Sequence, residues 1–326
     1  MNTNKNLHFV YCFDSNFNSQ AFASMSSLLD NVSEKVNISI LHNNLETINV
    51  IPQYIENHDR LLKMSKFQFK HFDIDFPNLE DSHVSQATYY RLFIDQYIDK
   101  EENFVIYIDA DMICISDPVE LIKDAIDTLN IDNLALGAKT EILRNLTERE
   151  IEIYMQKTFF KKYWPFDRLG IKDKYFNAGF MIINLKLWKK NLVFEKLITR
   201  MSEIKNDIVS WDQDVLNSFF DGEYLELPYK FNHFARNYNF NEKEILFLHF
   251  YGSKKPWTTD GVFEPPAEIY HSNYRKVHNK KYHIKNTWRR HSLNQFLKNV
   301  LNLNILKLKF PISYIKELLI SLVIKN

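Results

Sequence analysis

Short apolar runs alternate with segments that carry apolar residues at helical spacing over roughly the first 130 residues. The runs that predict buried strands are Leu7–Phe13, Val36–Leu41, Phe67–Ile74 and Phe104–Ile108. The segments that predict helices are Gln20–Leu29, Ile48–Leu62 and Thr88–Ile98, and Asp117-Pro118 is expected to begin a further helix. This alternation predicts an α/β domain with a mostly parallel sheet, and such sheets bind ligands outside the carboxyl ends of their strands.

After about Thr140 the pattern is less regular. Glu141–Phe166 is polar and is predicted to be helical, with a break at residues 163–166. The later predictions are strands at Tyr175–Leu187 and Ile245–Tyr251 and helices at Leu192–Met201 and Asp212–Phe219. Because no linker-like segment precedes about Tyr270, residues 1–270 are predicted to form one domain and residues 271–326 a C-terminal tail.

The composition is that of a globular protein with a sizeable core. Of the 326 residues, 45% are hydrophobic and only six are glycine, and neither the Walker nor the dinucleotide pattern of a phosphate-binding loop occurs. Cys12 and Cys114 each lie in an apolar run, which favours buried thiols in a reducing compartment over a disulfide. No secretory signal is recognised, and no run approaches the roughly 20 apolar residues of a membrane span.

The charges are unevenly distributed. The 41 basic and 41 acidic residues balance, but residues 271–326 hold 12 Lys or Arg against one acid, Glu317, so the first 270 residues have a net charge of −11. Apolar residues recur at helical spacing over Trp288–Leu301 and, after Pro311, over Ile312–Ile324. The two basic helices are predicted to lie on an anionic membrane surface. The alternative is that they pack on the acidic domain. No nucleic-acid partner is expected.

Asp109-Ala110-Asp111 directly follows the strand predicted at Phe104–Ile108. If the strand continues, both carboxylates point to the same side at its ligand-binding end. They repel each other unless a cation lies between them, which favours a metal site. The alternatives are a solvated turn and a phosphohydrolase with D-x-D after an apolar strand. The second is disfavoured, because Ile113 stands where Thr or Val is usual and about 100 residues of α/β pattern come first.

A second cluster, His249–Trp257, follows the last predicted strand. Imidazole combined with two carboxylates suits Mn²⁺, which accepts mixed nitrogen and oxygen ligands more readily than Mg²⁺ does. Gly252 allows the backbone to approach a phosphate, and Lys255 supplies a point charge. An ordinary turn would explain these residues alone. Taken with Asp111, 138 residues earlier, they predict a combined metal and phosphate site.

Two further clusters have simpler explanations. Asp212-Gln213-Asp214 begins a predicted helix, where acidic residues complement the helix dipole. Asp14-Ser15-Asn16-Phe17 follows the first strand, and Asp and Asn commonly form turns there. As a ligand site, this second cluster would meet a base and ribose, with Phe17 stacking on the base.

In this order, the clusters resemble glycosyltransferase family 8, over about residues 7–260. The motifs that carry the resemblance are Phe9–Phe17, Ala87–Leu92, Tyr107–Asp111, Phe176–Gly179, Asp212–Asp214 and His249–Trp257. Together with the basic tail, they are most similar to the bacterial lipopolysaccharide galactosyl- and glucosyltransferase branch. The resemblance implies a GT-A type nucleotide-diphospho-sugar transferase fold, a UDP-hexose donor, and Mn²⁺ with Mg²⁺ as the alternative.

It also implies that galactose or glucose is transferred, with retention of configuration, to a hydroxyl of a cell-surface glycan. That acceptor would be lipopolysaccharide or lipooligosaccharide, or another lipid-linked glycan, reached from the cytoplasmic face of the inner membrane. Two other functions stay open: a non-catalytic sugar-nucleotide or membrane-surface binding protein, and a glycogenin-like protein glucosyltransferase. The sequence also leaves open the sugar, the acceptor and linkage, the oligomeric state, and whether a covalent intermediate forms.

The resemblance assigns a role to each motif. Family members often have Tyr where Phe17 stands, so stacking is kept and a hydroxyl contact is lost. Asp109, Asp111 and His249 are assigned to the metal; Asp14, Asn16 and Phe17 to the uridine, with Ala110 also in the cofactor-binding set. Arg91, Asn177 and Asp212 are assigned to the donor sugar, and Gly252 and Lys255 to the diphosphate. Catalysis is assigned to Gln213, nearest the β face of the sugar, with Asp212 and Lys255, and acceptor contact to Glu141.

Overall fold

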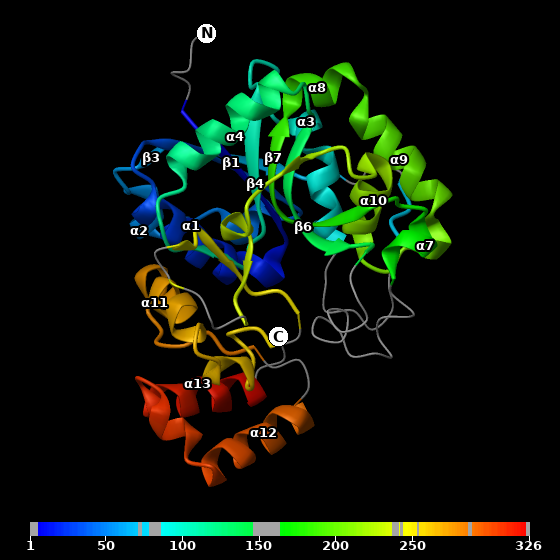
Figure 1. Cartoon of the computed structure of the whole chain (residues 1–326). Helices are drawn as coiled ribbons and strands as arrows, with labels where there is room; N and C mark the ends of the chain where they lie inside the picture. The colour runs from blue at the N-terminus through cyan, green and yellow to red at the C-terminus, as the bar shows by residue number, and fades with distance from the viewer. Residues whose placement is uncertain are drawn as a thin grey trace.

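The computed structural model describes residues 6–70, 74–77, 86–145, 164–236, 241, 244–252, 254–285 and 289–323. In this part of the chain, a seven-stranded sheet lies between two layers of helices, with a three-stranded sheet next to it (Figure 1). The large sheet consists, in spatial order, of β3 (Leu61–Gln68), β2 (Val36–His42), β1 (His8–Phe13), β4 (Phe104–Ile108), β7 (Lys174–Asn184), β6 (Leu136–Leu143) and β8 (Leu225–Glu226). The small sheet consists of β5 (Met112–Cys114), β10 (Phe247–His249) and β9 (His233–Phe234).

The large sheet is mostly parallel, as predicted. The pairings from β3 through β4 are parallel, β7 runs antiparallel to β4 and β6, and β8 pairs parallel with β6. Both faces are buried: in β1, Phe9, Tyr11 and Phe13 face one core, and Val10 and Cys12 face the other. Both cysteines are free and buried, as predicted.

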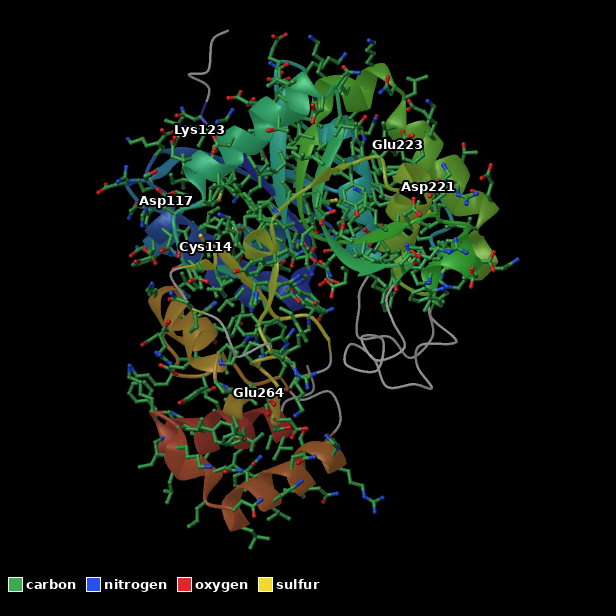
Figure 2. All side chains as sticks on the ribbon, in the orientation of Figure 1. Cys114, Asp117, Lys123, Asp221, Glu223 and Glu264 are labelled. Carbon is green, nitrogen blue, oxygen red and sulfur yellow. The ribbon has the colours of Figure 1, made fainter. Side chains whose placement is uncertain are left out.

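Helices cover each core. The first core is covered by α1 (Asn18–Asn31), α2 (Gln53–Glu56) and α4 (Val119–Ile131). The second is covered by η3 (Gln86–Phe93), α3 (Ile94–Tyr97), α7 (Pro165–Leu169), α8 (Leu185–Lys190), α9 (Val193–Glu203) and α10 (Trp211–Phe220). Asp117, labelled in Figure 2, precedes α4 as predicted. Its Oδ1 accepts a hydrogen bond from Val119 N–H at 3.1 Å.

Two predictions around the third strand are wrong. The helix predicted over Ile48–Leu62 is only the short α2, preceded by η2 (Leu45–Ile48), and β3 already begins at Leu61. The strand predicted at Phe67–Ile74 instead ends at Gln68, and residues 71–73 lie outside the described residues. The reason is that β3 is an edge strand, whose polar and partly exposed side chains conceal the apolar alternation.

The helix predicted over Glu141–Phe166 is wrong where the structure describes it. Glu141 lies in β6, paired with β7, and α7 is a separate short helix that begins at Pro165. Residues 146–163 lie outside the described residues. Thr88–Ile98 is helical as predicted, although its first part is the 3-10 helix η3.

The C-terminal segment begins with α11 (Ala267–Val277), which packs on α1. Lys276 Nζ donates to Asp30 Oδ2 of α1 at 2.6 Å. The boundary predicted between residues 270 and 271 therefore falls inside a helix. Beyond it, α12 (Arg289–Leu301), η8 (Asn304–Lys307) and α13 (Pro311–Val323) lie at the end of the molecule away from the large sheet (Figure 1). Within the described ranges, every helix is too short or too polar to cross a bilayer.

Asp214, in the first turn of α10, holds the start of that helix. Its carboxylate is fully buried and accepts hydrogen bonds from the backbone N–H groups of Val209 and Ser210, at 2.7 and 2.8 Å. Arg168 Nη1 and Tyr175 OH each donate to the same carboxylate at 2.8 Å. This fully paired carboxylate joins α7, α10 and β7.

We predict that Asp214→Asn lowers the free energy of unfolding by about 3 kcal/mol, because the neutral amide leaves the half-buried Arg168 guanidinium without its buried carboxylate partner. Asp127→Asn, at an exposed position of α4, should change it by less than about 0.5 kcal/mol. Urea unfolding followed by circular dichroism measures both variants. Equal stabilities would contradict this role for Asp214.

Candidate metal centre

The candidate centre lies where the small sheet meets the carboxyl end of β4. Asp109–Asp111 form a turn after that strand, in which Met112 N–H donates to Asp109 O at 3.2 Å. The next strand, β5, pairs antiparallel with β10, and this places His249 opposite Met112. Phe250 N–H then donates to Asp111 O at 3.0 Å. The strand does not continue through the aspartates; the β5–β10 pairing brings them to the histidine.

Asp109, Asp111 and His249 form a group with metal-ligating chemistry. One ligand atom of each lies within 4.8 Å of the others. His249 Nε2 is 3.1 Å from Asp111 Oδ1 and 3.7 Å from Asp109 Oδ2. His249 and Asp111 are buried, with 3% and 8% of their surface exposed, and Asp109 is half-buried. Two carboxylates and one imidazole nitrogen fit a divalent ion that accepts mixed oxygen and nitrogen ligands.

Lys255 provides the cation that balances Asp111. Its Nζ donates to Asp111 Oδ2. Burial by itself would raise the pKa of Asp111, but Lys255 and His249 together outweigh burial and hold that pKa below its usual range. Asp111 is therefore ionised at neutral pH and available as a ligand.

A chain of amide groups orients the imidazole. Gly179 N–H donates to Asn177 Oδ1 at 3.0 Å, and Asn232 Nδ2 donates to the same oxygen at 2.8 Å. Asn232 therefore presents its Oδ1, an acceptor, to His249 Nδ1 at 2.9 Å. Because Nδ1 carries the hydrogen, Nε2 is the nitrogen whose lone pair can bind a metal beside the carboxylates.

Gly179 makes this arrangement sterically possible. Pairing of β6 with β7 shifts register here, so that Ala138 faces Met181 while the next residue, Lys139, faces Asn177. At this irregularity Gly179 O accepts from Asp109 N–H at 2.8 Å. A Cβ on Gly179 would lie 2.3 Å from His249 Cε1 and 2.7 Å from its Nδ1. The absence of a side chain is what lets β7 approach both the aspartate turn and the imidazole.

Arg91 lies beneath the carboxylates, almost fully buried. Its Nη1 is 3.2 Å from Asp109 Oδ1, and its Nε is 2.8 Å from Asp212 Oδ2. Its Nε also donates to Thr88 O, and its Nη2 donates to Thr88 Oγ1. Its Nη1 donates to Ala178 O at 2.7 Å. The guanidinium carbon also lies 4.7 Å from the centre of the Tyr107 ring. Arg91 thus neutralises two acids of the site and ties them to β7.

The first turn of α10 adds two side chains. Burial raises the pKa of Asp212 to about 6, although the Arg91 cation limits the rise. Thr88 Oγ1 donates to Asp212 Oδ1. Gln213 Oε1 accepts from Ala178 N–H at 3.0 Å, and its Nε2 donates to Tyr175 OH at 3.2 Å. Gln213 therefore lies against the same stretch of β7 as His249 does, and Asp212 is connected to that stretch through Arg91.

The Asp14–Phe17 cluster follows β1, at the same edge of the sheet as Asp109. Asp14 Oδ1 accepts from Asn16 N–H at 2.9 Å, which is the turn-forming role expected of an Asp there. The Phe17 ring meets the Trp257 ring edge-on at 6.4 Å between centroids. This contact connects the cluster to the segment that carries Lys255.

The remaining predicted residues lie around the centre. Ala110 is buried between the two aspartates. Gly252 has a φ of 83°, in the left-handed region that favours glycine. Glu141 Oε1 accepts from Tyr251 OH at 2.6 Å, and the Tyr251 ring lies 4.8 Å from the His249 ring. The structure therefore brings every predicted site residue to one end of the sheet.

Sequence reasoning missed Asn232 and gave Gly179 no role. Asn232 lies between η5 (Tyr229–Phe231) and β9, in a segment without periodicity or motif. Gly179 was quoted only as part of a motif, although a glycine inside an apolar strand is a recognised sign of close backbone approach.

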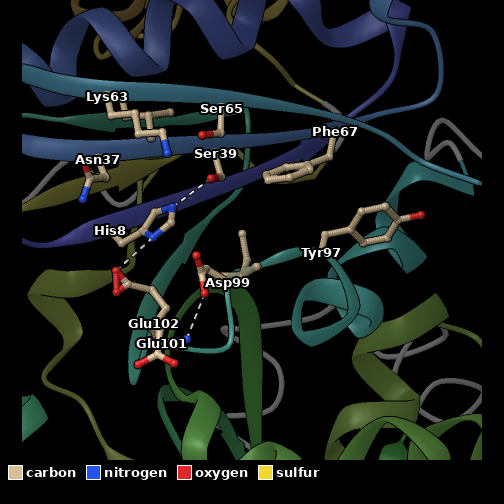
Figure 3. A pocket seen from close by; sticks show the side chains of 12 residues that line it. His8, Asn37, Ser39, Lys63, Ser65, Phe67, Tyr97, Asp99, Glu101 and Glu102 are labelled. Carbon is tan, nitrogen blue, oxygen red and sulfur yellow. Dashed lines mark hydrogen bonds and ion pairs between the residues drawn. The ribbon is translucent and has the colours of Figure 1, made fainter.

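A cavity of about 460 Å³ lies elsewhere, over the first residues of β1 and the edge formed by β2 and β3. His8 lines it, with Nε2 2.8 Å from Ser39 Oγ and Nδ1 3.5 Å from Glu102 (Figure 3). Its lining includes none of the metal-centre residues, and it lies toward the amino ends of the strands, opposite the usual ligand-binding end.

We predict that Gly179→Ala lowers the affinity for Mn²⁺ at least about tenfold, because the added methyl group displaces the imidazole. Gly137→Ala in β6 is the matched control, since its Cβ would first meet Leu227 at an ordinary 3.4 Å. Calorimetric titration with Mn²⁺ measures both, with thermal unfolding as the check on folding. Unchanged Mn²⁺ affinity in Gly179→Ala would contradict the assignment of His249 as a ligand.

The chain is similar to known glycosyltransferases in sequence. The family model for glycosyl transferase family 8 matches residues 8–261. The lipopolysaccharide 1,3-galactosyltransferase of Salmonella typhimurium is 32% identical over 187 residues, 54% of this chain and 51% of that protein, so the match spans about half of that relative. General stress protein A of Bacillus subtilis is 25% identical over 292 residues, 81% of this chain and 92% of that protein.

The fold is similar to a solved enzyme as well. The crystal structure of galactosyltransferase LgtC in complex with donor and acceptor sugar analogs superposes with a TM-score of 0.63, covering 83% of this chain and 96% of that chain at 20% identity. At this identity the similarity establishes the GT-A fold alone. Since the family model covers most of the chain and includes the whole Asp109–Asp111–His249 centre, the protein belongs to glycosyl transferase family 8 and is related to the bacterial lipopolysaccharide galactosyl- and glucosyltransferases.

Proposed function

We propose that this protein is a retaining hexosyltransferase that moves galactose or glucose from a UDP-sugar to a hydroxyl of a cell-surface glycan. Lipopolysaccharide is the acceptor that we propose. The observation that carries the proposal is the buried centre of Asp109, Asp111 and His249 with Lys255 against it. Supporting it, the lipopolysaccharide 1,2-glucosyltransferase of Escherichia coli is 27% identical over 270 residues, 75% of this chain and 71% of that protein.

The donor is proposed to extend across the edge of the sheet, from the metal centre to the Asp14–Phe17 cluster. Asp109, Asp111 and His249 would hold Mn²⁺, or Mg²⁺, near the diphosphate. The uridine would lie on Phe17, beside Asp14 and Asn16, because these residues follow β1, which neighbours β4 in the sheet.

The leaving group is the reason for the positive charge at the site. Breaking the bond between hexose C1 and the β-phosphate oxygen places negative charge on UDP. A divalent ion, when bound, supplies Lewis-acid stabilisation of that charge. Lys255 is assigned to the same charge, and its ammonium already lies at Asp111. Gly252 has a left-handed φ, and because it carries no side chain, a phosphate could approach its backbone closely.

Retention is proposed to result from attack on the face that UDP leaves. The acceptor oxygen forms the new bond to C1, and its proton moves to the departing phosphate oxygen. Gln213, which we assign to the β face of the sugar, is held by Ala178 and Tyr175 and is a poor nucleophile. It would stabilise the positive charge that develops at C1. Arg91, Asn177 and Asp212 complete the donor-sugar side.

The acceptor is proposed to bind beside Glu141. Its carboxylate is shared between Tyr251 OH and Lys139 Nζ, each at 2.6 Å. The Tyr251 ring stacks on Phe234 at 4.2 Å between centroids and contacts His249. An aromatic face bordered by a carboxylate, next to the metal centre, suits an acceptor sugar, whose apolar face stacks while its hydroxyls donate.

The C-terminal tail is proposed to attach the enzyme to anionic lipid on the cytoplasmic face of the inner membrane. One side of α12 and α13 joins a small core with Val262, Tyr282 and Ile284. Large apolar side chains of α12, of α13 and of the segment between them are exposed: Leu293, Leu297, Val300, Leu301, Leu303, Leu306, Ile312 and Leu319. The exposed Lys298 and Lys307 lie among them in the sequence. The helices therefore pack on the domain and still present an apolar, basic surface suited to a bilayer interface.

For the chemistry, wild-type protein with Mn²⁺ is expected to release UDP from UDP-galactose or UDP-glucose. Asp111→Asn should lower kcat/KM at least about a hundredfold through the lost ligand, without unfolding. Asp132→Asn, exposed at the end of α4, should leave the rate unchanged. Proton NMR of the glycoside from an α-configured donor should show an α linkage.

The outcomes separate the candidate functions. Undiminished turnover by Asp111→Asn in the presence of a chelator would contradict the metal site, and a β linkage would contradict retention. Donor binding without UDP release from any nucleotide sugar would indicate a non-catalytic binding protein. Hexose added to the chain itself, seen by mass spectrometry, would indicate a glycogenin-like activity.

For the membrane, we expect wild-type protein to co-sediment with anionic vesicles in a salt-sensitive manner. Leu301, Leu306 and Ile312 are 83%, 71% and 83% exposed. Replacing all three by Ser should weaken partitioning to the vesicles at least about tenfold. The control pair Val50→Ser and Ile131→Ser, 75% and 82% exposed on the catalytic domain, should not. Wild-type partitioning by the triple variant would mean that the tail only packs on the domain.

A further inference from the structure

Lys285, in the C-terminal segment, reaches the cluster that follows β1. It lies outside residues 8–261, which the family model matches. Its backbone N–H donates to Trp257 O at 2.8 Å. Its Nζ donates to Asn16 O and lies 5.9 Å from the centre of the Phe17 ring. A residue that follows α11 is thus held against the turn that begins η1.

We propose that Lys285 is a donor-binding residue, through which the C-terminal segment completes the nucleoside end of the site. This inference rests on the proposed function, because it takes Asp14, Asn16 and Phe17 as the uridine site. The ligand is identified by its chemistry as a nucleotide whose base, ribose and first phosphate present hydrogen-bond acceptors.

The surroundings of the ammonium favour a ligand contact. Burial lowers the pKa of Lys285, and the carboxylate of Asp14 opposes that change. Among the described residues, the hydrogen-bond partner of Nζ is the single carbonyl of Asn16. An ammonium has three donors, so a partly buried one retains capacity for an acceptor-rich ligand. Phe17, which would stack on the base, lies within cation–π range of the same ammonium.

The position also complements Lys255. Lys255 Nζ lies 5.8 Å from the centre of the Trp257 ring, on the side of Asp111. Phe17 contacts that ring edge-on, and Lys285 is bonded to the Trp257 carbonyl. Trp257 therefore connects the two lysines: its ring lies near the Lys255 ammonium, and its carbonyl accepts from the backbone N–H of Lys285. A nucleoside diphosphate extending from Asp111 to Phe17 would meet a positive charge at each end.

The test compares the full-length protein with Lys285→Met and Lys285→Arg. UMP affinity is measured by calorimetry with a chelator present, and UDP affinity with Mn²⁺. Lys285→Met is expected to weaken both about tenfold, by losing a charge-assisted hydrogen bond, while Lys285→Arg keeps most of the affinity. Lys280→Met, which removes a pair with Glu317 at 3.1 Å within the tail, is the matched control and should bind as wild type does.

A second measurement distinguishes a Lys285 that contacts the ligand from one that only holds the C-terminal segment to η1. UMP should protect the Lys285 amine of the wild-type protein from acetylation, as read by mass spectrometry. If Lys285→Met melts at a lower temperature but binds UMP as wild type does, or if UMP gives no protection, Lys285 only holds the C-terminal segment to η1 and the inference is wrong. If the wild-type protein binds neither UMP nor UDP, the proposed function itself fails, which is a distinguishable result.

Discussion

The close approach of β7 to β10 at Gly179 is the constraint on which the rest of the site depends. The residue donates its N–H to Asn177, accepts from the Asp109 N–H, and leaves the space that the His249 ring fills. Each of these contacts places a different part of the metal centre. If the backbones were further apart, the aspartate turn and the imidazole would be positioned independently of each other, and a ligand set within 4.8 Å would not be maintained.

The second requirement is charge balance in a buried site. Asp109, Asp111 and Asp212 lie close together, and buried carboxylates are stable only when they are paired. The two cations that pair them differ in how they are held. Arg91 is bonded to the backbone carbonyls of Thr88 and Ala178 as well as to acids, so it belongs to the framework. Lys255 lies three residues after Gly252, whose φ is left-handed, and its ammonium contacts Asp111. In the proposed reaction, this ammonium would exchange the carboxylate for a phosphate.

The C-terminal segment has two relationships to the catalytic domain. Near its start, α11 and the residues up to Lys285 contact α1 and η1, beside the proposed uridine site. Further on, α12 and α13 pack through one side only and leave the opposite side apolar and basic. Under the proposed function, a segment that contacts the donor cluster at one end and the membrane at the other would couple the orientation of the active site to the bilayer proposed to carry the acceptor.

Local patterns in the sequence determined the main elements and the order of the site motifs. The alternation of apolar and helical segments predicted β1, β2, β4, α1 and the tail helices, because burial on both faces of a parallel sheet selects continuous apolar runs. Two regions were predicted wrongly: the edge strand β3, and the start of Glu141–Phe166, which was predicted to be helical but lies in β6. Strand pairing there outweighs local propensity. The partnerships within the site were decided only by tertiary structure. Asn232 orients His249 from a segment without a motif, and Lys285 meets Asn16 across 269 residues of sequence. Such contacts join segments far apart in the sequence, and the order of the strands and the packing of the helices decide which of these segments meet.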